Sequence, residues 1–589
     1  MKLNIISLLC LISLLAPSSS QARDDGKSNT FVQNSITDTN FTTADYIIVG
    51  VGTAGAVLAK KLTDDKCTSV IAIHNGSNLS KDPLIKYSRN AIFTVLASLI
   101  GAPIPADPSV FNVPETFKNP FIRFMASVPA RVPVLYIQGL TTAQPFADNR
   151  NLLWEIAIPE GGASSINAGA WCVGTNQVYA QWEAIAGPNW SVPRIREIYK
   201  ELEEYHGKTP DPQFHGFDGP ISIKQKRPSG LSRVFSQAIV DATGLPFVLD
   251  YNDPNTPIGA SERMQLTQSG PNGVYRVSSV NAFLGKKMVN ENGHGINGRR
   301  LRINFNSTAL RVLWDGNRAV GVEFSQGGET KKVFAKQGVI VTAGLFSSAF
   351  LMRSGVGPSS LLESLNIPVI FDNPNVGQGL VDQPPVYLVF STNPKDFPKH
   401  ENAVFQQIAW LPAVNGNQTI REYRLSTAKL IPGISLAVFD LVQPRSRGSI
   451  TLESADPFVP PIIDDGVLSN PTDLALFQSG LSVYIKNINT ALQAIDPQYQ
   501  LIFPDPAILD DPLLVTSFIQ EIVGTNMCFQ SHCRMAPLDQ GGVVDSEGRV
   551  YGVQNLIVAD DSIVPLCMDG SPMASAYLIA ANVAKLMGF

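Results

Sequence analysis

The feature that most constrains this chain is the stretch DYIIVGVGTAG at residues 45–55. An apolar, β-branched run ends at Gly50, Gly52 and Gly55, and a segment compatible with a helix and a second apolar run (69–73) follow. Strand, glycine turn, helix and strand in this order are typical of a dinucleotide-binding unit. There, Gly50 permits the turn, Gly52 lets backbone approach a pyrophosphate, and Gly55 lets helix and strand pack closely. We therefore expect an α/β unit that binds a dinucleotide at the start of the helix.

The second strand of this unit ends without its usual acid. An Asp or Glu is expected roughly 20 residues after the glycines, where it binds a ribose hydroxyl. The strand end reads Ile73-His74-Asn75-Gly76, so His74 stands in that place. A neutral imidazole accepts a hydrogen bond but lacks the charge that strengthens it. We therefore expect dinucleotide binding to be weakened here.

The bulk composition limits the fold and its partners. At 589 residues the chain is too long for one ordinary core, so we expect two domains. A composition of 44% hydrophobic and 16% charged residues is typical of globular proteins. The net charge of −5 comes without a basic run, which argues against a nucleic-acid partner. The cysteine spacing defines no zinc site, and we expect no metal.

The first 22 residues have the pattern of a signal peptide. Lys2 is the basic start, residues 3–16 form an apolar core, and the segment ends with small residues at Ala22. The core is shorter than the roughly 20 residues of a membrane span, which favours cleavage over an anchor, and no later stretch is apolar enough to cross a membrane. Secretion as a glycoprotein is supported by sequons at Asn40, Asn75, Asn78, Asn189, Asn306 and Asn417. A glycan on Asn75 would lie beside His74, so either Asn75 is unmodified or the cofactor is absent.

Later segments add a second small-residue run and further regular elements. Residues 159–169 read PEGGASSINAG. Such a run lets backbone approach a flat or anionic group, or it forms a tight loop between packed elements. Residues 385–460 contain short strand-like runs that indicate an antiparallel sheet. Residues 573–587 form a terminal helix rich in alanine and leucine.

These motifs, taken in order, resemble the glucose–methanol–choline (GMC) oxidoreductase family. The resemblance covers nearly all of residues 45–589 and depends on an ordered set of motifs, not on one. After DYIIVGVGTAG and GGASSINAG come VTAGLFSSAFLMRSGVGP, NVGQGLVDQP, SRGSITL, HCRM, IVADDSIVP and SPMASAYLIA. The resemblance implies a mixed α/β (α+β) fold with a Rossmann-like FAD-binding domain and a substrate domain built on an antiparallel sheet. It assigns residues 45–375 and 540–589 to the FAD-binding domain and residues 376–539 to the substrate domain.

The resemblance also implies which residues hold FAD. The turn glycines would contact the pyrophosphate, and the second small-residue run would line the isoalloxazine. The start of the last helix would approach the flavin pyrimidine ring, where a helix N-terminus suits negative charge. Because His74 replaces the ribose acid, we expect FAD occupancy to be weak or absent. The candidate FAD-binding residues are Gly50, Gly52, Gly55, His74, Gly162, Ser165, Asn167, Asp560, Pro572 and Met573.

The catalytic positions depart from the family pattern. The family's catalytic His, at the head of the motif HPxGTCRM, falls on Cys528, and the second catalytic His or Asn falls on Ser571. Neither residue has an imidazole to accept a hydroxyl proton. If residues 528–532 are extended, Cys528 and His532 share a face, and His532 can replace the lost base. The alternative is a His532 that is bonded within its own loop.

Three functions follow from these departures. The first is a secreted, FAD-dependent oxidoreductase that acts on a CH–OH group of a small metabolite, in secondary metabolism, with a rearranged active site. The second is a redox-neutral lyase, cyclase or isomerase, because the family includes hydroxynitrile lyases and versicolorin B synthase. The third is a catalytically inactive binding protein on the same scaffold. The sequence leaves the substrate, the electron acceptor and the oligomeric state open.

Overall fold

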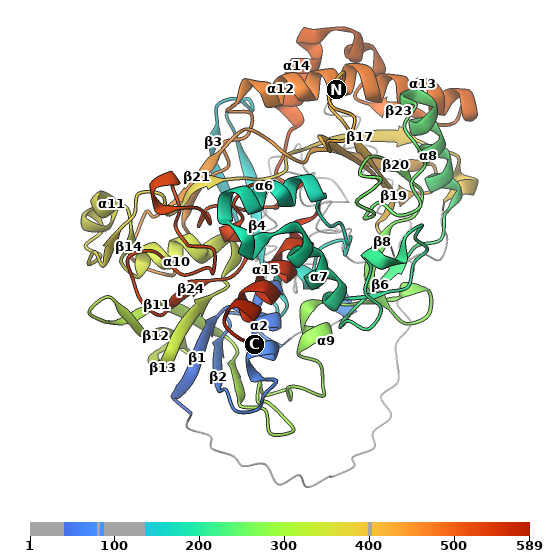
Figure 1. Ribbon diagram of the computed structural model, residues 1–589. Helices are drawn as coiled ribbons and strands as arrows, with labels where there is room; N and C mark the ends of the chain where they lie inside the picture. Colours follow the sequence, from blue (N-terminus) through green and yellow to red (C-terminus); the bar gives the residue numbers. More distant parts are fainter. Residues whose placement is uncertain (1–40, 79–82, 87–135, 398–402) are drawn as a thin grey trace.

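The computed structural model of the protein describes residues 41–78, 83–86, 136–397 and 403–589 (Figure 1). The predicted signal peptide and the Asn40 sequon lie outside these residues. Within the described part of the chain, no helix combines the length and the apolar character that a membrane span requires.

A sheet of seven strands forms the centre of the first domain. Its order is β10-β2-β1-β13-β12-β11, and β24 pairs with the other end of β13. Strands β10, β2, β1, β13 and β24 run parallel, whereas β12 and β11 are antiparallel extensions. The strands are β1 (Thr43–Val49), β2 (Val70–Ile73), β10 (Leu301–Asn304), β11 (Ser307–Asp315), β12 (Arg318–Gln326), β13 (Glu329–Val341) and β24 (Leu556–Val558). Strands from both ends of the chain therefore build one sheet, as a discontinuous domain requires.

Helices α2 (Thr53–Thr63) and α15 (Pro572–Leu586) pack together against this sheet. Nearly every residue of α15 is buried. A helix that is apolar all round is stable only inside a core, which accounts for its alanine and leucine content. The first turn of each helix lies at the same end of the sheet, close to the carboxyl ends of the parallel strands (Figure 1). Ligands in open α/β sheets bind at that edge.

The second domain contains the expected antiparallel sheet. Its six strands are ordered β23-β17-β20-β19-β18-β7. They are β7 (Gly259–Ser261), β17 (Pro385–Ser391), β18 (Phe405–Leu411), β19 (Tyr423–Ile431), β20 (Ile434–Leu441) and β23 (Gln500–Phe503). Helices pack on one face of the sheet around a core separate from the first, and these are α8 (Gly230–Thr243), α12 (Pro471–Ser479), α13 (Lys486–Ile495) and α14 (Pro512–Ile522) (Figure 1). The two cores and the two sheets confirm the mixed α/β, two-domain fold.

The two domains interleave along the chain. Strand β7 and helix α8 fall inside residues 45–375, which the sequence assigns to the FAD-binding domain, yet β7 pairs with β18 of the antiparallel sheet. The domain boundaries at residues 375 and 540 stay a prediction. The spatial division therefore does not follow a single cut in the sequence.

Smaller elements connect the two sheets. Strands β3 (Tyr136–Gln144) and β4 (Arg150–Ala157) form a hairpin, and β4 leads into the small-residue run. The other strands are β5 (Glu203–Tyr205), β6 (Ile221–Gln225), β8 (Gln265–Ser269), β9 (Tyr275–Arg276), β14 (Val356–Gly357), β15 (Phe371–Asp372), β16 (Gln378–Leu380), β21 (Gly448–Thr451) and β22 (Ile462–Asp464). The other α-helices are α3 (Pro83–Lys86), α6 (Asn176–Ala186), α7 (Val192–Leu202), α9 (Ser279–Phe283), α10 (Ser347–Arg353) and α11 (Ser359–Ser364).

Candidate active site

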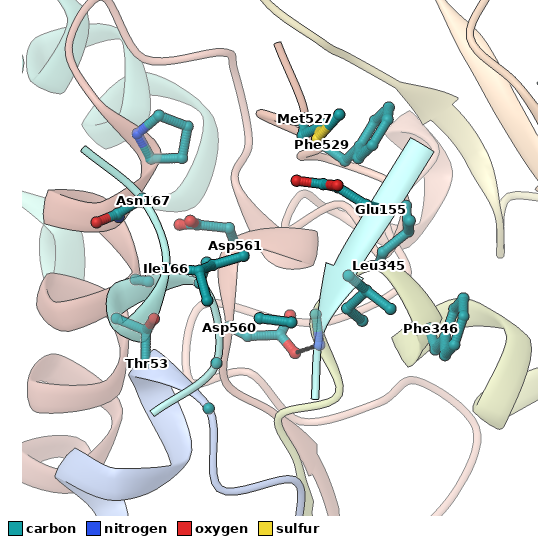
Figure 2. Close-up of a pocket in the computed structure, with 18 of the residues that line it drawn as sticks. Thr53, Glu155, Ile166, Asn167, Leu345, Phe346, Met527, Phe529, Asp560 and Asp561 are labelled. Atoms are coloured by element: carbon teal, nitrogen blue, oxygen red, sulfur yellow. Dashed lines mark hydrogen bonds between the residues drawn. The ribbon is translucent and has the colours of Figure 1, made fainter. Parts of the chain in front are cut away.

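A cavity of about 630 Å³ lies between the two sheets. At one end it is lined by the glycine turn after β1, and at the other by side chains of β17 to β20. Figure 2 shows the labelled side chains around this space, with Ile166 and Asn167 on one side and Glu155, Leu345 and Phe346 on the other. One continuous space therefore joins the dinucleotide-binding turn to the second domain.

The glycines of the two small-residue runs face each other across the cofactor end. Gly50 has φ of +101°, and a Cβ there would lie 2.5 Å from the carbonyl oxygen of Thr342. Gly162 has φ of +53°, and its Cβ would lie 2.9 Å from the Cα of Gly52. A side chain at Gly50 or Gly162 would therefore collide with the neighbouring backbone at the cofactor end. Glycine keeps the backbone accessible to a pyrophosphate.

Two helices begin at the cavity without side-chain caps. No side chain caps the start of α2, where Gly52, Thr53 and Ala54 line the cavity. The same is true of α15, where Pro572 and Met573 line it. Backbone N–H groups in the first turn of a helix lack intrahelical partners and attract anions. The cavity thus offers one helix start to a pyrophosphate and a second to a polar ring.

His74 is a buried, neutral residue at the ribose position. Burial lowers the pKa of its ring to about 4. Its Nδ1 accepts a hydrogen bond from the backbone N–H of Val51 at 3.3 Å, so the proton resides on Nε2. This nitrogen is buried and has no hydrogen-bond partner among the described residues. His74 therefore presents a donor where the family presents a carboxylate acceptor.

Asp560 organises the loops around the cofactor end. Its Oδ2 accepts hydrogen bonds from the backbone N–H of Gly344 at 2.8 Å and from the Ser347 hydroxyl at 2.7 Å, and its Oδ1 accepts one from the Ser562 N–H. Burial raises the pKa of its carboxyl group. The side chain thus ties the start of α10 to the segment after β24. Both segments line the cavity beside it.

Three of the sequence-predicted site residues do not line the cavity: Gly55, Ser165 and His532. Gly55 is a packing residue, since a Cβ there would lie 2.0 Å from the carbonyl oxygen of Gly50. The Ser165 hydroxyl donates to the carbonyl of Glu160 at 2.7 Å and fixes the turn from behind. These two residues shape the cofactor end without contacting it.

The expectation that His532 faces the cavity is corrected by the backbone of its loop. Ser531 has φ of +70°, so residues 528–532 are not continuously extended and their side chains do not alternate between two faces. The His532 ring is fully buried, and its Nδ1 lies 2.8 Å from the hydroxyl of Ser348. Burial lowers its pKa to about 3. His532 is therefore a neutral packing residue outside the cavity.

Cys528 lines the substrate end of the cavity, where the family has its catalytic His. Its backbone N–H and that of Asn526 donate to the two carboxylate oxygens of Asp382, at 2.7 Å and 2.6 Å. Burial, with the nearby Asp382 charge, raises the pKa of the Cys528 thiol well above its usual range. The thiol is thus neutral at ordinary pH, and a neutral thiol is a poor nucleophile and a poor base.

Ser571 lines the cavity at the first residue before α15. The preceding loop is held by Gln383, whose amide group donates to the carbonyls of Val442, Met568 and Gly570. The amide therefore fixes the loop that positions Ser571, and its side chain is fully buried.

The sequence analysis did not select five charged residues that line the cavity: Glu155, Arg353, Arg424, Asp440 and Asp561. Glu155 lies on β4, is 6% exposed, and has an Oε1 with no hydrogen-bond partner among the described residues. Its Oε2 accepts from the amide of Gln138 at 2.9 Å. Burial raises its pKa to about 7. No local signal singles out Glu155 or Arg424, because β4 also carries Arg150 and β19 also carries Lys429.

The residues present fit FAD. The glycines and the start of α2 would hold the pyrophosphate, the free Nε2 of His74 would meet a ribose hydroxyl, and Asn167 with the start of α15 would face the ring. Asn167 is held in place by an Arg276 guanidinium nitrogen 3.1 Å from its Oδ1. The donor set therefore matches an anionic dinucleotide with a ring that gains negative charge on reduction.

Comparison with known proteins identifies the same family that the sequence motifs resemble. Family models described as GMC oxidoreductase match residues 44–385 and residues 444–580. A 5-(hydroxymethyl)furfural oxidase from a Methylovorus species is 27% identical, over 93% of this chain and 99% of its own. An oxygen-dependent choline dehydrogenase from Rhizobium etli is also 27% identical, over 89% and 91%.

Solved structures share the fold at lower identity. The crystal structure of pyridoxine 4-oxidase from Mesorbium loti superposes with a TM-score of 0.76 at 22% identity, covering 92% of this chain and 99% of that one. Formate oxidase from Aspergillus oryzae gives the same TM-score at 20% identity, covering 93% and 98%. The matched family models, together with FAD-dependent proteins among the solved structures, support FAD as the cofactor that fits the cavity. With both domains matched in order, this chain belongs to the GMC oxidoreductase family.

Proposed function

We propose that this protein oxidises a CH–OH group of a small metabolite with FAD, using a rearranged active site. The main support for this proposal is the cavity that runs from Gly52 to the antiparallel sheet. A dinucleotide on the glycine turn would bring its ring beside Asn167 and Ser571, next to the substrate end. Bound FAD would supply hydride acceptance there. The residues of this chain bind and orient the substrate and take its proton.

The hydroxyl proton needs an acceptor in the cavity. Cys528 has a neutral thiol, and among the described residues the Ser571 hydroxyl has no hydrogen-bond partner to activate it. Glu155 has a raised pKa of about 7 and a free Oε1. Figure 2 shows its carboxyl group projecting from β4 beside Met527 and Phe529. We assign Glu155 as the general base, because its pKa matches a reaction near neutral pH.

Secretion is part of the proposal. The leader pattern at residues 1–22 supports export, and the sequons support glycosylation. Asn75 is exposed but lines the cofactor cavity, and its Oδ1 accepts from the Thr308 hydroxyl at 3.1 Å. A glycan there would block the ribose end. We therefore propose that Asn75 is unmodified in protein that holds FAD.

A redox-neutral reaction is the second candidate. The observation that favours it is the loss of an imidazole at both catalytic positions, now Cys528 and Ser571. A lyase, cyclase or isomerase on this scaffold would use Glu155 to move a proton while the flavin oxidation state stays unchanged. Both candidates therefore share one base and differ in the fate of the electrons.

Anaerobic stopped-flow mixing separates the candidates. Purified secreted protein is mixed with a panel of small alcohols, and absorbance is followed at about 450 nm, a band of oxidised flavin. Loss of the band at a rate that saturates with substrate supports oxidation. Product formed while the band persists would replace oxidation with the redox-neutral reaction. If no alcohol bleaches the band and none is converted, both enzyme proposals fail and a binding role is left.

A further inference from the structure

A cation faces the substrate end of the cavity from the antiparallel sheet. Arg424 on β19 lies directly opposite Asp440 on β20, and both residues line the cavity. The Arg424 Nε donates to Oδ2 of Asp440 at 2.8 Å. The side chains are 14% and 0% exposed. The pair is therefore fixed at the sheet surface and not in solvent.

The pair leaves the far edge of the guanidinium group free. Among the described residues, the two terminal nitrogens of Arg424 have no hydrogen-bond partner, and neither is fully buried. Asp440 is held on its other oxygen by the amide of Asn526, at 3.0 Å. Although burial disfavours the charge, Asp440 raises the pKa of Arg424, so the guanidinium is always charged. The two free nitrogens form the planar fork that binds a carboxylate through two hydrogen bonds.

The surroundings make this fork a binding group for a small anion. Arg424 and Cys528 line the same cavity. Asp440, the partner of Arg424, also accepts from the amide of Asn526, which lies two residues before Cys528. Apolar side chains line the same end, from Met264, Phe405, Ile408 and Val438. Arg353 also lines the cavity, but its Nη2 donates to the carbonyl of Val459 on another segment. A charge on Arg424 in apolar surroundings acts strongly, because water does not screen it.

We propose that Arg424 selects substrates that carry a carboxylate near the oxidised CH–OH group. The carboxylate would bind the two free nitrogens, and the rest of the molecule would lie on the apolar side chains. Arg424 would thereby place the substrate hydroxyl at the catalytic position, next to Cys528. This inference rests on the proposed function, because it names the substrate class of the same site.

The test measures binding of benzoate and of benzamide to the FAD-loaded protein by calorimetry. The two probes have the same ring and differ in charge. We expect benzoate to bind at least about tenfold more tightly than benzamide, since a bidentate, charge-assisted pair exceeds one neutral hydrogen bond. Binding of these probes needs no turnover. A failure of the proposed oxidation therefore appears in the stopped-flow experiment and leaves this measurement interpretable.

Variants assign the preference to Arg424. Arg424→Gln should remove the benzoate preference, and Arg424→Lys should keep only part of it, because lysine lacks the fork. The double variant Arg424→Gln with Asp440→Asn removes both charges and avoids an unpaired buried carboxylate that could unfold the protein. Arg445→Gln is the matched control, since Arg445 pairs with Glu422 and does not line the cavity. It should leave the preference unchanged.

Three results would overturn the proposal. The first is equal affinity of the native protein for benzoate and benzamide. The second is a benzoate preference that survives in the double variant, with FAD content and circular dichroism like those of the native protein. Loss of binding for both probes in the double variant, with the fold intact, would also count against it, because charge selection predicts that benzamide binding persists.

Discussion

The imidazole ring of His215 lies flat against the phenol ring of Tyr205, with centroids 3.7 Å apart and planes at 5°. The two His215 nitrogens each lie 2.7 Å from a carboxylate oxygen, one of Glu203 and one of Asp250. All three partners are buried. The Trp171 indole also donates to Glu203. One cation therefore joins β5, the loop before β6 and the loop after α8.

This network makes stability depend on pH. Burial alone would lower the pKa of His215, but the hydrogen bonds to Asp250 and Glu203 raise it to about 9. Because the folded pKa exceeds the unfolded value of about 6.5, the stabilisation is complete below about pH 6.5 and is lost as pH rises through about 9. We expect His215→Gln to cost about 3 kcal/mol at pH 6. The cost should shrink by pH 10.

Thermal unfolding from pH 6 to pH 10 measures this effect. The control is His206→Gln, because the His206 side chain is exposed and lies 3.3 Å from the carboxylate of Glu204, whose side chain is also exposed. It should shift the midpoint little at any pH. A His215→Gln variant that loses the same stability at pH 6 and pH 10 would contradict the role of the charged imidazole.

The second prediction concerns the base. Glu155→Gln should lower the rate of substrate turnover by about 10² to 10⁴, the usual contribution of a general base. Cys528→Ala should cost far less, because the thiol is neutral. In the native protein the rate should rise as pH increases through about 7, where the Glu155 carboxyl loses its proton. A pH profile of single-turnover rates checks this, and an unchanged rate in Glu155→Gln would assign the proton to another group.

The third prediction concerns the ribose position. His74→Glu should tighten FAD binding by about tenfold, or about 1.4 kcal/mol, because a carboxylate accepts a charge-assisted hydrogen bond from a ribose hydroxyl, whereas the neutral Nε2–H of His74 only donates one. Titration of the apoprotein with FAD, followed by flavin fluorescence, measures the affinity. Weaker binding in the variant would mean that the Nε2–H of His74 already makes the contact.

The fourth prediction compares two glycines with similar backbone. Gly162 has φ of +53° and its Cβ would meet the Cα of Gly52 at 2.9 Å, whereas Gly316 has φ of +60° and open space around it. Both alanine variants have the strain of a positive φ, but only Gly162→Ala closes the cofactor end. We expect FAD content to fall in Gly162→Ala and to stay unchanged in Gly316→Ala. Flavin-to-protein absorbance ratios decide the comparison.

Local sequence patterns predicted the helices and strands whose conformation is set by residues close to them in the sequence. The strand, turn and helix at residues 45–63 and the buried helix at residues 572–586 follow from periodicity and glycine placement. The β3–β4 hairpin was not predicted, because β3 lies in the proline-rich stretch 77–148, which has no clear period, and β4 does not alternate between polar and apolar residues. Glu155 was missed with it. Its importance lies in burial, which one strand does not reveal.

The site residues show the same contrast between positions set by a local turn and positions set by tertiary structure. Gly52 and Ser571 lie where the motifs place them because each belongs to a short local turn. His532 does not, because one residue with positive φ, Ser531, reverses the alternation on which the argument depended. Strands β19 and β20 form a hairpin around the turn at residues 432–433, and its register sets Asp440 opposite Arg424. Arg424 was missed because the cavity that the pair lines is formed by segments far apart in the chain.

Strand β24 and helix α15 come from the last part of the chain but complete the sheet and the cavity that begin at β1. During synthesis, the glycine turn therefore leaves the ribosome long before the helix against which α2 packs. A nascent chain that lacks α15 has the start of α2 but not Pro572 and Met573, which line the same cavity. The cofactor end is therefore complete only after α15 has packed on α2.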